Sequence, residues 1–359
     1  MGKSLLVIFC YETSTSSLGL RRTSVNSEEL EADGECPNCG ANRYHSDVIS
    51  DYLFNVEWDR HVLPCKEILQ CSDCSVMYAW PMPSEASLEA YYTDIYRAPG
   101  RPHHFSGQPQ ILVRHLAYLS YISTFVPLPE LKRVYEIGAG FGEMGLLLKT
   151  VNPKIELVTH EPDSYARGHL EDVGYTVLPN ASATEQGVDL VLSIHSMEHF
   201  ANLQDFFSLS SCLRNGGYLF VEVPNCSVTD GWLSRPYDSP HLLFFDSATF
   251  QKSIETRQFK TVAISKSGIS LSDNFSLGFE LKRQLGEWRP ESNDGRRPRP
   301  SSARELARQL LPTRATEIIQ AALGSAQTRP LLAGASDINN SATEGWLLRG
   351  LFQKLEGDA

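Results

Sequence analysis

The most informative stretch of the chain is Val134-Tyr135-Glu136-Ile137-Gly138-Ala139-Gly140-Phe141-Gly142, which leads from apolar residues into the amphipathic run 143–150. The apolar start predicts a strand, and the run after it predicts a helix. Glycines at this junction permit a tight turn and let a ligand approach the backbone at the sheet edge where α/β folds bind ligands. The spacing G-x-G-x-G also occurs in ordinary strand-to-helix turns, so it does not by itself identify a ligand.

An acidic residue strengthens the case for a nucleotide-type ligand. Glu161 follows the next expected strand, 19 residues beyond Gly142, where a carboxylate is placed to accept hydrogen bonds from ribose hydroxyls. Dinucleotide-binding enzymes share this pairing, but their loop has the longer spacing G-x-G-x-x-G. Glu136, two positions before the first glycine, is a further difference from them.

Short apolar runs alternate with helical stretches around this loop, which is typical of a parallel sheet covered by helices. The expected strands are 133–137, 155–160, 175–178, 188–194 and 218–223. Two more runs, 260–266 and 275–282, leave no room for a helix between them and predict a terminal antiparallel hairpin. The fold class is therefore α/β.

The run 136–142 resembles the first motif of class I S-adenosylmethionine (SAM) dependent methyltransferases. The segments 189–200 and 213–225 are similar to the same family's fourth-strand motif and to its entry into strand five. The resemblance spans about 133–282. It implies a Rossmann-like seven-stranded sheet with a terminal antiparallel strand, and SAM as the cofactor.

The resemblance also implies which residues border SAM. They are Glu136, Gly138, Gly140, Phe141, Glu161, Asn180 and His195. Glu136 is interpreted as a structural or cofactor-orienting carboxylate and not as an acid catalyst. Glu161 would hold the ribose, Asn180 would lie near the adenine, and His195 would line the methionine side. Glu198 and His199 are interpreted as residues that cap or orient the following helix, because polar groups commonly open helices.

Two cysteine pairs, Cys36-Pro37-Asn38-Cys39 and Cys71-Ser72-Asp73-Cys74, predict a structural zinc site with four thiolate ligands. A redox-active pair is the alternative, but two separated pairs favour a metal. His45, His61 and Cys65 lie between the pairs as conceivable substitute ligands. We expect the four cysteines of the pairs to bind the zinc.

This module resembles the N-terminal zinc-binding domain of deoxysugar and natural-product C-methyltransferases, also through the trailing run 91–96. The resemblance implies that the module covers the substrate site and that Tyr92 and Tyr96 approach it. An aromatic cluster that only packs is the alternative.

His241 is the best candidate for a general base, because it follows the strand 218–223 and histidine titrates near neutrality. A structural role in positioning its loop is the alternative. In the sugar C-methyltransferases a Tyr-His-Glu-His run stands here, and His241 matches its last residue, whereas Asp238-Ser239-Pro240 departs from it. Transfer of the methyl group to carbon, oxygen or nitrogen therefore stays open.

The net charge of the chain limits the classes of substrate that it is expected to bind. A net charge of -11 disfavours a nucleic-acid surface and favours a small molecule such as a sugar, a sugar nucleotide or a natural-product intermediate. The alternatives are a ribosomal-RNA methyltransferase with a zinc module and a non-catalytic binding protein of the same fold. The apolar run 5–10 is too short to span a membrane, and paired cysteines suit a reducing cytoplasm. Monomer and homodimer are both open.

The predicted organisation has five segments along the chain. They are a flexible leader over 1–34, a zinc module over 35–96, a SAM-binding domain over 97–285, a linker over 286–302 and a tail of short helices over 303–359. Within the tail, apolar residues at helical spacing predict an amphipathic helix over 342–355, although Gly350 weakens it.

Overall fold

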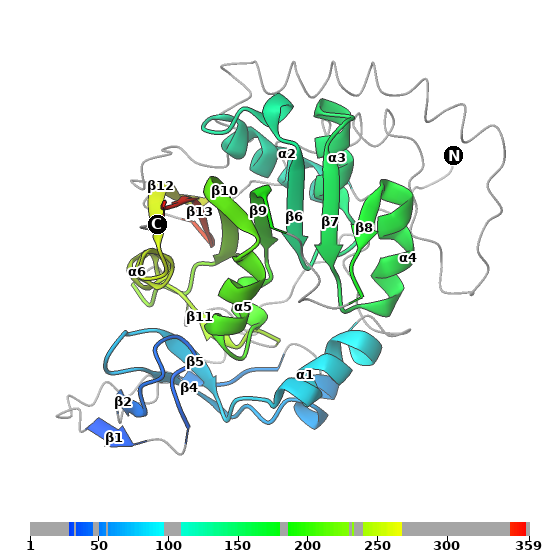
Figure 1. Cartoon of the computed structure of the whole chain (residues 1–359). Helices are drawn as coiled ribbons and strands as arrows, with labels where there is room; N and C mark the ends of the chain where they lie inside the picture. Colours follow the sequence, from blue (N-terminus) through cyan, green and yellow to red (C-terminus); the bar gives the residue numbers. More distant parts are fainter. Residues whose placement is uncertain are drawn as a thin grey trace, which may run out of the picture.

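The computed structural model describes residues 29–31, 34–45, 50–54, 57–96, 109–179, 186–229, 232, 240–267 and 345–356. Its centre is a seven-stranded sheet in the order β12-β13-β10-β9-β6-β7-β8 (Figure 1). The strands are β6 Arg133–Ile137, β7 Glu156–His160, β8 Tyr175–Val177, β9 Val188–Ile194, β10 Leu213–Pro224, β12 Phe259–Ser267 and β13 Leu347–Lys354. Strands β6 to β10 pair in parallel, and β13 runs antiparallel to both β10 and β12.

Helices cover the sheet on both faces. They are α2 Pro109–Ser123, α3 Glu143–Val151, α4 Ser164–Val173, α5 Leu203–Ser210 and α6 Ser247–Glu255, with short turns η3 Leu128–Glu130 and η5 Met197–His199. One apolar cluster packs α2 and α3 on the sheet, as Leu116 and Leu147 illustrate. The other packs α5 and α6, through Phe206 and Phe250. The expected α/β fold with a Rossmann-like seven-stranded sheet is confirmed.

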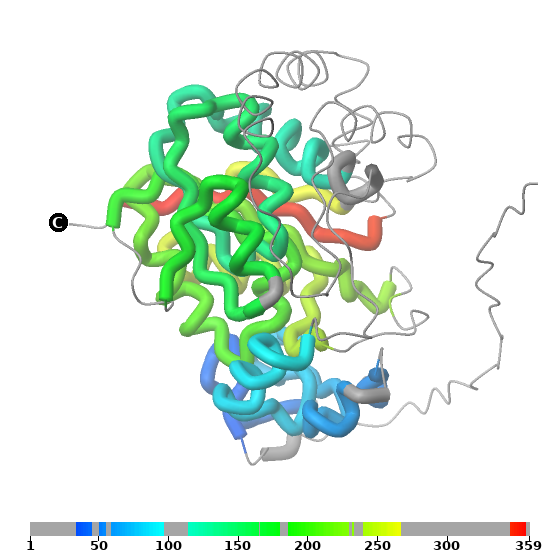
Figure 2. The backbone as a smooth tube through the Cα atoms, turned by 90° about the vertical axis from the view of Figure 1, so that its right-hand side faces the viewer, coloured from blue at the N-terminus to red at the C-terminus, as the bar shows by residue number. Residues whose placement is uncertain are grey.

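The antiparallel strand differs from the prediction. The partner of β12 is β13, whereas 275–282 lies outside the described residues. The predicted helix over 342–355 is therefore wrong. Its apolar residues do not alternate because β13 lies inside the sheet and is covered on both faces, so Leu348, Leu351 and Phe352 are all fully buried. Figure 2 shows this strand in red, running across the body of the molecule.

Gly350 suits the strand because of its close neighbours. A Cβ atom at this position would lie 2.5 Å from the ring of Phe352 and 2.8 Å from that of Phe250. The glycine that weakens a helix thus allows two aromatic rings to pack against the strand.

The N-terminal module contains two small sheets. Its elements are β1 Glu29–Glu31, β2 Arg43–His45, β3 Ser50–Asp51, η1 Glu57–His61, β4 Glu67–Gln70, β5 Met77–Trp80, α1 Glu85–Ala90 and η2 Tyr91–Ile95. Strand β1, which lies within the expected leader 1–34, pairs with β2. The expected linker 286–302 and the tail up to 344 lie outside the described residues.

The module and the main sheet are joined by a shared strand and a shared core. Strand β11, Leu243–Phe244, follows β10 in the chain and completes the module's sheet in the order β11-β5-β4-β3. Leu69 and Tyr78 of the module belong to the same apolar cluster as Ile137 of β6. Among the described residues, no helix is long and apolar enough to cross a lipid bilayer.

Candidate active site

The glycine loop connects β6 to α3 at the carboxyl edge of the sheet. Gly138 and Gly140 have φ angles of 68° and 56°, which side-chain-bearing residues rarely adopt. A Cβ atom on Gly138 would lie 2.8 Å from Oγ of Ser196, whose hydroxyl donates to the Ile137 carbonyl at 2.9 Å. The loop is therefore held against the segment that follows β9.

Glu161 lies beside this loop at the end of β7. Its buried carboxylate accepts hydrogen bonds from the backbone N–H of Gly140 at 2.7 Å and of Asp163 at 3.0 Å. Each carboxylate oxygen has more than one acceptor position, so these bonds orient the group and leave capacity for ribose hydroxyls. The arrangement fits the SAM role that the sequence predicts for Glu161.

The other predicted cofactor residues are placed differently. Glu136 is buried and accepts a hydrogen bond from the Tyr175 hydroxyl, which indicates a structural role. Burial raises the pKa of Glu136 to about 8, although the Tyr175 hydrogen bond opposes the shift. Phe141 packs edge-on against His169 with ring centroids 5.5 Å apart. Asn180 lies outside the described residues.

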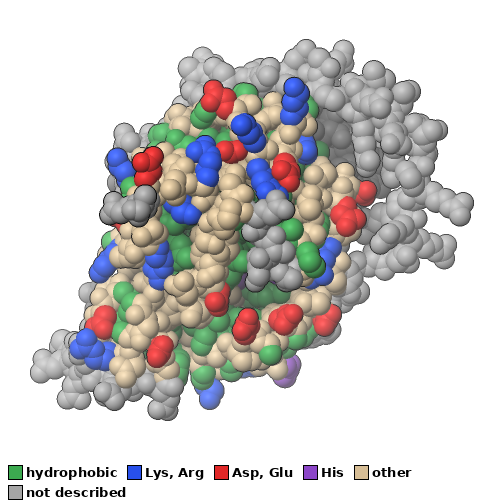
Figure 3. Space-filling view, in the orientation of Figure 1, with side chains coloured by type: hydrophobic (Ala, Val, Ile, Leu, Met, Phe, Trp, Pro, Cys, Tyr) green, Lys and Arg blue, Asp and Glu red, His purple; other side chains and the backbone are tan. Residues whose placement is uncertain are grey.

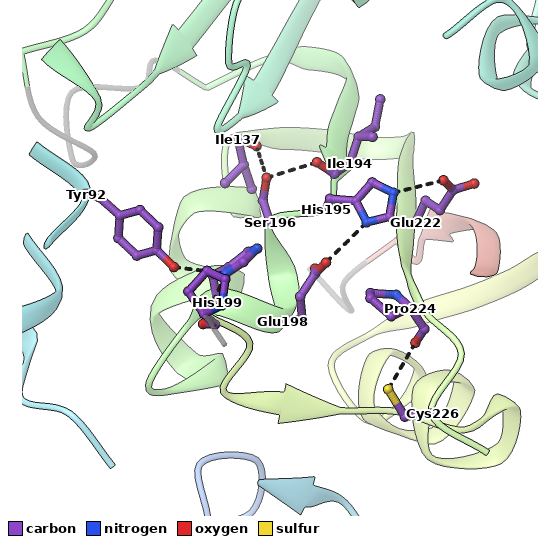
Figure 4. A network of polar contacts seen from close by, with 11 residues as sticks. Tyr92, Ile137, Ile194, His195, Ser196, Glu198, His199, Glu222, Pro224 and Cys226 are labelled. Atoms are coloured by element: carbon purple, nitrogen blue, oxygen red, sulfur yellow. Dashed lines mark hydrogen bonds and ion pairs between the residues drawn. The ribbon is translucent and has the colours of Figure 1, made fainter. Parts of the chain in front are cut away.

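His195 ends β9 and takes part in a buried chain of charges (Figure 4). Its Nδ1 lies 3.4 Å from Glu198, and its Nε2 lies 3.4 Å from Glu222. Glu222 is paired in turn with fully buried Arg349 of β13 at 2.7 Å. Burial alone would lower the pKa of His195, but the two carboxylates outweigh it and raise the pKa to about 9.

A second group of polar side chains lies where the module meets the sheet edge. We call it the acceptor cluster and define it as Tyr92, Glu198, His199 and His241. The Tyr92 hydroxyl lies 2.9 Å from His199 Nδ1, and the rings of His199 and His241 lie 5.0 Å apart. One potential ligand atom from each of Glu198, His199 and His241 lies within 4.8 Å of the others. Figure 4 shows Tyr92 approaching His199 from the module.

The structure modifies the roles expected from the sequence. Helix α5 is capped by Asn202, whose side chain accepts from the Gln204 N–H at 2.7 Å, so Glu198 and His199 do not cap it. The only sequence signal for these two was an acid and a histidine directly after a buried strand. Removal from water, reinforced by the positive charge of neighbouring His199, lowers the pKa of His241 to about 3. Near neutral pH the His241 imidazole is thus uncharged and only weakly basic.

Tyr96, predicted as a catalytic residue, stands behind the acceptor cluster. Its ring packs at 5.3 Å from Tyr92 and at 5.9 Å from Tyr91. Its position is that of a residue that supports the Tyr92 ring.

The four paired cysteines converge in the module. Their sulfur atoms lie within 4.8 Å of one another, with 3.6 Å between Cys36 and Cys74 and between Cys39 and Cys71. A tetrahedral zinc with Zn–S bonds of about 2.3 Å would separate its sulfurs by about 3.8 Å, so the donor set fits zinc. All four are free cysteines, without a disulfide.

Two of the other conceivable zinc ligands, Cys65 and His61, lie away from the four sulfurs. Cys65 is buried among Tyr52 and Leu63 in a separate apolar cluster, and His61 is exposed on η1. The side chain of His45 lies outside the described residues.

The strand order, the single antiparallel strand and the glycine loop beside Glu161 together define a Rossmann-like methyltransferase domain. The methyltransferase domain family matches residues 112–311, which is more than half of the chain, and the chain belongs to this family. No curated protein matches it.

Similar solved structures include a SAM dependent methyltransferase from Archaeoglobus fulgidus (17% identity, 68% of this chain and 94% of that chain covered, TM-score 0.38). The plantazolicin methyltransferase BamL has 15% identity, with 70% and 86% covered and a TM-score of 0.39. Coclaurine N-methyltransferase has 15% identity, with 67% and 72% covered and a TM-score of 0.39.

Proposed function

We propose that this protein is a SAM-dependent methyltransferase that acts on a small molecule. The observation that carries the proposal is the buried Glu161 carboxylate, oriented by the Gly140 N–H at the loop where the family binds its cofactor. Glu161 would hold the ribose, while Gly138 and Gly140 would let the cofactor approach the backbone. SAM itself supplies an electrophilic methyl group on a sulfonium.

The acceptor would bind between the sheet edge and the module. Ser196, which touches the glycine loop, is only two and three residues from Glu198 and His199, so the acceptor cluster borders the expected SAM site. Tyr92 brings the module into the same place. These groups would exclude water and hold the accepting atom in line with the methyl carbon.

A small-molecule acceptor is favoured over a ribosomal RNA. The side chains coloured in Figure 3 carry both signs of charge, intermixed across the face shown, in keeping with the net charge of -11. Phosphate binding by RNA enzymes depends on clustered lysine and arginine. Sugars, sugar nucleotides and natural-product intermediates are the acceptor classes to test, by mass spectrometry of methyl transfer to pooled compounds.

We further propose that Cys36, Cys39, Cys71 and Cys74 hold one structural zinc. Four thiolates leave no open coordination position, so this metal would stabilise the module and take no direct part in the chemistry. The short sulfur separations support this role.

Calorimetry with SAM and S-adenosylhomocysteine tests the cofactor proposal. Glu161→Ala should weaken binding by about 1–3 kcal/mol, because it removes a charged hydrogen-bond acceptor. Glu171→Ala, on the exposed side of α4, is the matched control and should bind like the wild type. Folded wild-type protein that binds neither compound would refute the proposed function.

A further inference from the structure

The buried Glu198 carboxylate is ion-paired with His195 but receives no hydrogen bond from the described residues. The side chain is fully buried, yet neither of its oxygens accepts a hydrogen bond from a described residue. His195 stands 3.4 Å from one oxygen as a charged neighbour. Leaving carboxylate oxygens unbonded away from water is costly, so the site is suited to a cation that would coordinate them.

The His199 ring is oriented by two groups that are not among the three potential ligands. Its Nδ1 lies 3.3 Å from the Pro240 carbonyl oxygen, which can only accept, and 2.9 Å from the Tyr92 hydroxyl. This surrounding favours the tautomer with hydrogen on Nδ1 and leaves the lone pair on Nε2. A metal-binding histidine commonly donates its other ring N–H to a carbonyl in this way.

The position of His241 is fixed by its backbone. The His241 carbonyl accepts from the Tyr52 hydroxyl at 2.9 Å, and the Leu242 N–H donates to the Glu198 carbonyl at 2.8 Å. The loop that carries His241 is thereby tied both to the module and to the turn that carries Glu198. Glu198, His199 and His241, whose potential ligand atoms lie within 4.8 Å of one another, therefore stand on segments that hydrogen bonds hold in place.

We propose that Glu198, His199 and His241 bind one divalent transition-metal ion at the acceptor side of the active site. Two imidazoles and one carboxylate suit Mn²⁺, Fe²⁺, Co²⁺ or Zn²⁺ better than Mg²⁺ or Ca²⁺, which prefer oxygen ligands throughout. Three protein ligands leave coordination positions open, in contrast to the closed site of four cysteines.

The role of this metal site rests on the proposed methyl transfer. In that reaction the site selects an acceptor that is methylated on an oxygen atom. One carboxylate and a divalent ion leave a net charge of +1, which an ionised phenolic or enolic oxygen would neutralise. The acceptor's hydroxyl proton would pass to bulk water as the acceptor enters the site, because a bound divalent ion makes a coordinated O–H more acidic. The oxygen's electron pair then forms the bond to the methyl carbon, and the electrons of the broken C–S bond remain on sulfur as S-adenosylhomocysteine.

The test is titration with MnCl₂ of the full-length protein that carries one zinc ion per chain, the amount the four cysteines hold, monitored by calorimetry and by electron paramagnetic resonance of Mn²⁺. Mn²⁺ prefers nitrogen and oxygen ligands to thiolates, so it will not report on the cysteine site. We expect one Mn²⁺ per chain. Glu198→Gln and His241→Gln should weaken binding at least about 100-fold, and Tyr92→Phe by about 10- to 100-fold, since it removes only the group that orients a ligand.

His61→Gln is the matched control, because it removes an exposed histidine outside the acceptor cluster and should leave Mn²⁺ binding unchanged. Circular dichroism checks that each variant folds. If Glu198→Gln does not fold, His241→Gln and Tyr92→Phe decide the question.

Binding of S-adenosylhomocysteine, measured on the same samples, separates the two proposals. Wild-type protein that binds S-adenosylhomocysteine but no Mn²⁺, or variants that keep full Mn²⁺ affinity, would overturn the metal site and leave the proposed function standing. Protein that binds Mn²⁺ but neither SAM nor S-adenosylhomocysteine would overturn the proposed function alone.

Discussion

Two buried carboxylates near the glycine loop have different environments. Glu161 accepts hydrogen bonds from two backbone N–H groups at the sheet edge, which fix the orientation of its carboxylate. Glu136 lies within the sheet with the Tyr175 hydroxyl as its described partner, and burial raises its pKa to about 8. The first is suited to binding a ligand, and the second to holding β6 against β8.

The raised pKa of Glu136 makes a prediction for Glu136→Gln. A carboxyl group whose pKa rises on folding, here from 4.5 to about 8, stabilises the fold fully below pH 4.5 and loses that contribution as the pH climbs to about 8. Compared with the glutamine variant, the wild type should lose stability between these limits, by at most about 1.4 kcal/mol per pH unit. Urea unfolding at pH 5, 6 and 7 gives the free energy of unfolding of both proteins. If this free energy changes with pH equally in the wild type and in Glu136→Gln, the prediction is wrong.

Local spacing explains which site residues could be predicted. Gly138, Gly140 and Glu161 follow from a motif and the strand after it, because neighbouring parallel strands end at the same edge. The acceptor cluster could not be predicted in full, since Tyr92 and His199 are 107 residues apart and meet only through tertiary packing. Only two of its members were active-site candidates from the sequence: His241 through its place after the strand 218–223, and Tyr92 through a resemblance.

At the scale of elements, β13 is the main departure from the sequence-based prediction. An apolar run buried on both faces lacks the alternation that marks a half-exposed strand, so periodicity alone does not separate it from a helix. The strand also carries Arg349, which is fully buried between Glu222 and the rings of Tyr118 and Tyr121. Strands β6 and β9, by contrast, were predicted to the residue.

Arg349→Met should be strongly destabilising. It leaves the Glu222 charge buried without its main partner, and we expect a loss of about 3–5 kcal/mol in the free energy of unfolding. The double variant Arg349→Met/Glu222→Gln should recover part of this loss. Arg214→Met is the control, since Arg214 is half-exposed, and its loss from Asp189 should cost about 1 kcal/mol or less. Denaturant unfolding measures the free energy of unfolding of the three variants. If Arg349→Met and Arg214→Met lower it equally, Arg349 is not the main partner of the buried Glu222 charge.

At the scale of the whole molecule, the module and the methyltransferase domain are interdependent. Strand β11 belongs to the domain by sequence and to the module by pairing, and one apolar cluster includes residues of both. The sequence predicted the module from its cysteines but gave no sign of the shared strand, because β11 has only two residues. Unfolding of the module should therefore also disturb the structure of the acceptor cluster.

Loss of zinc tests this dependence. Cys71→Ser should lower the zinc content by about one ion per chain and lower the melting temperature, because metal binding supplies much of the folding free energy of small zinc modules. Cys65→Ser, which changes a buried cysteine outside the four, should keep its zinc. Elemental analysis and thermal melts measure the two variants. A Cys71→Ser protein that retains as much zinc as the wild type would exclude the four-cysteine site.

The place of β13 has a consequence for biosynthesis. Glu222 of β10 and Arg349 of β13 are 127 residues apart in the chain. At the usual translation rate of about 5–20 residues per second, roughly 6–25 s pass between the synthesis of Glu222 and that of Arg349. During that interval the nascent sheet has open edges at β10 and β12, and such edges invite pairing with other chains. We therefore expect the newly made protein to depend on chaperones during this interval, although the finished sheet is closed at this point.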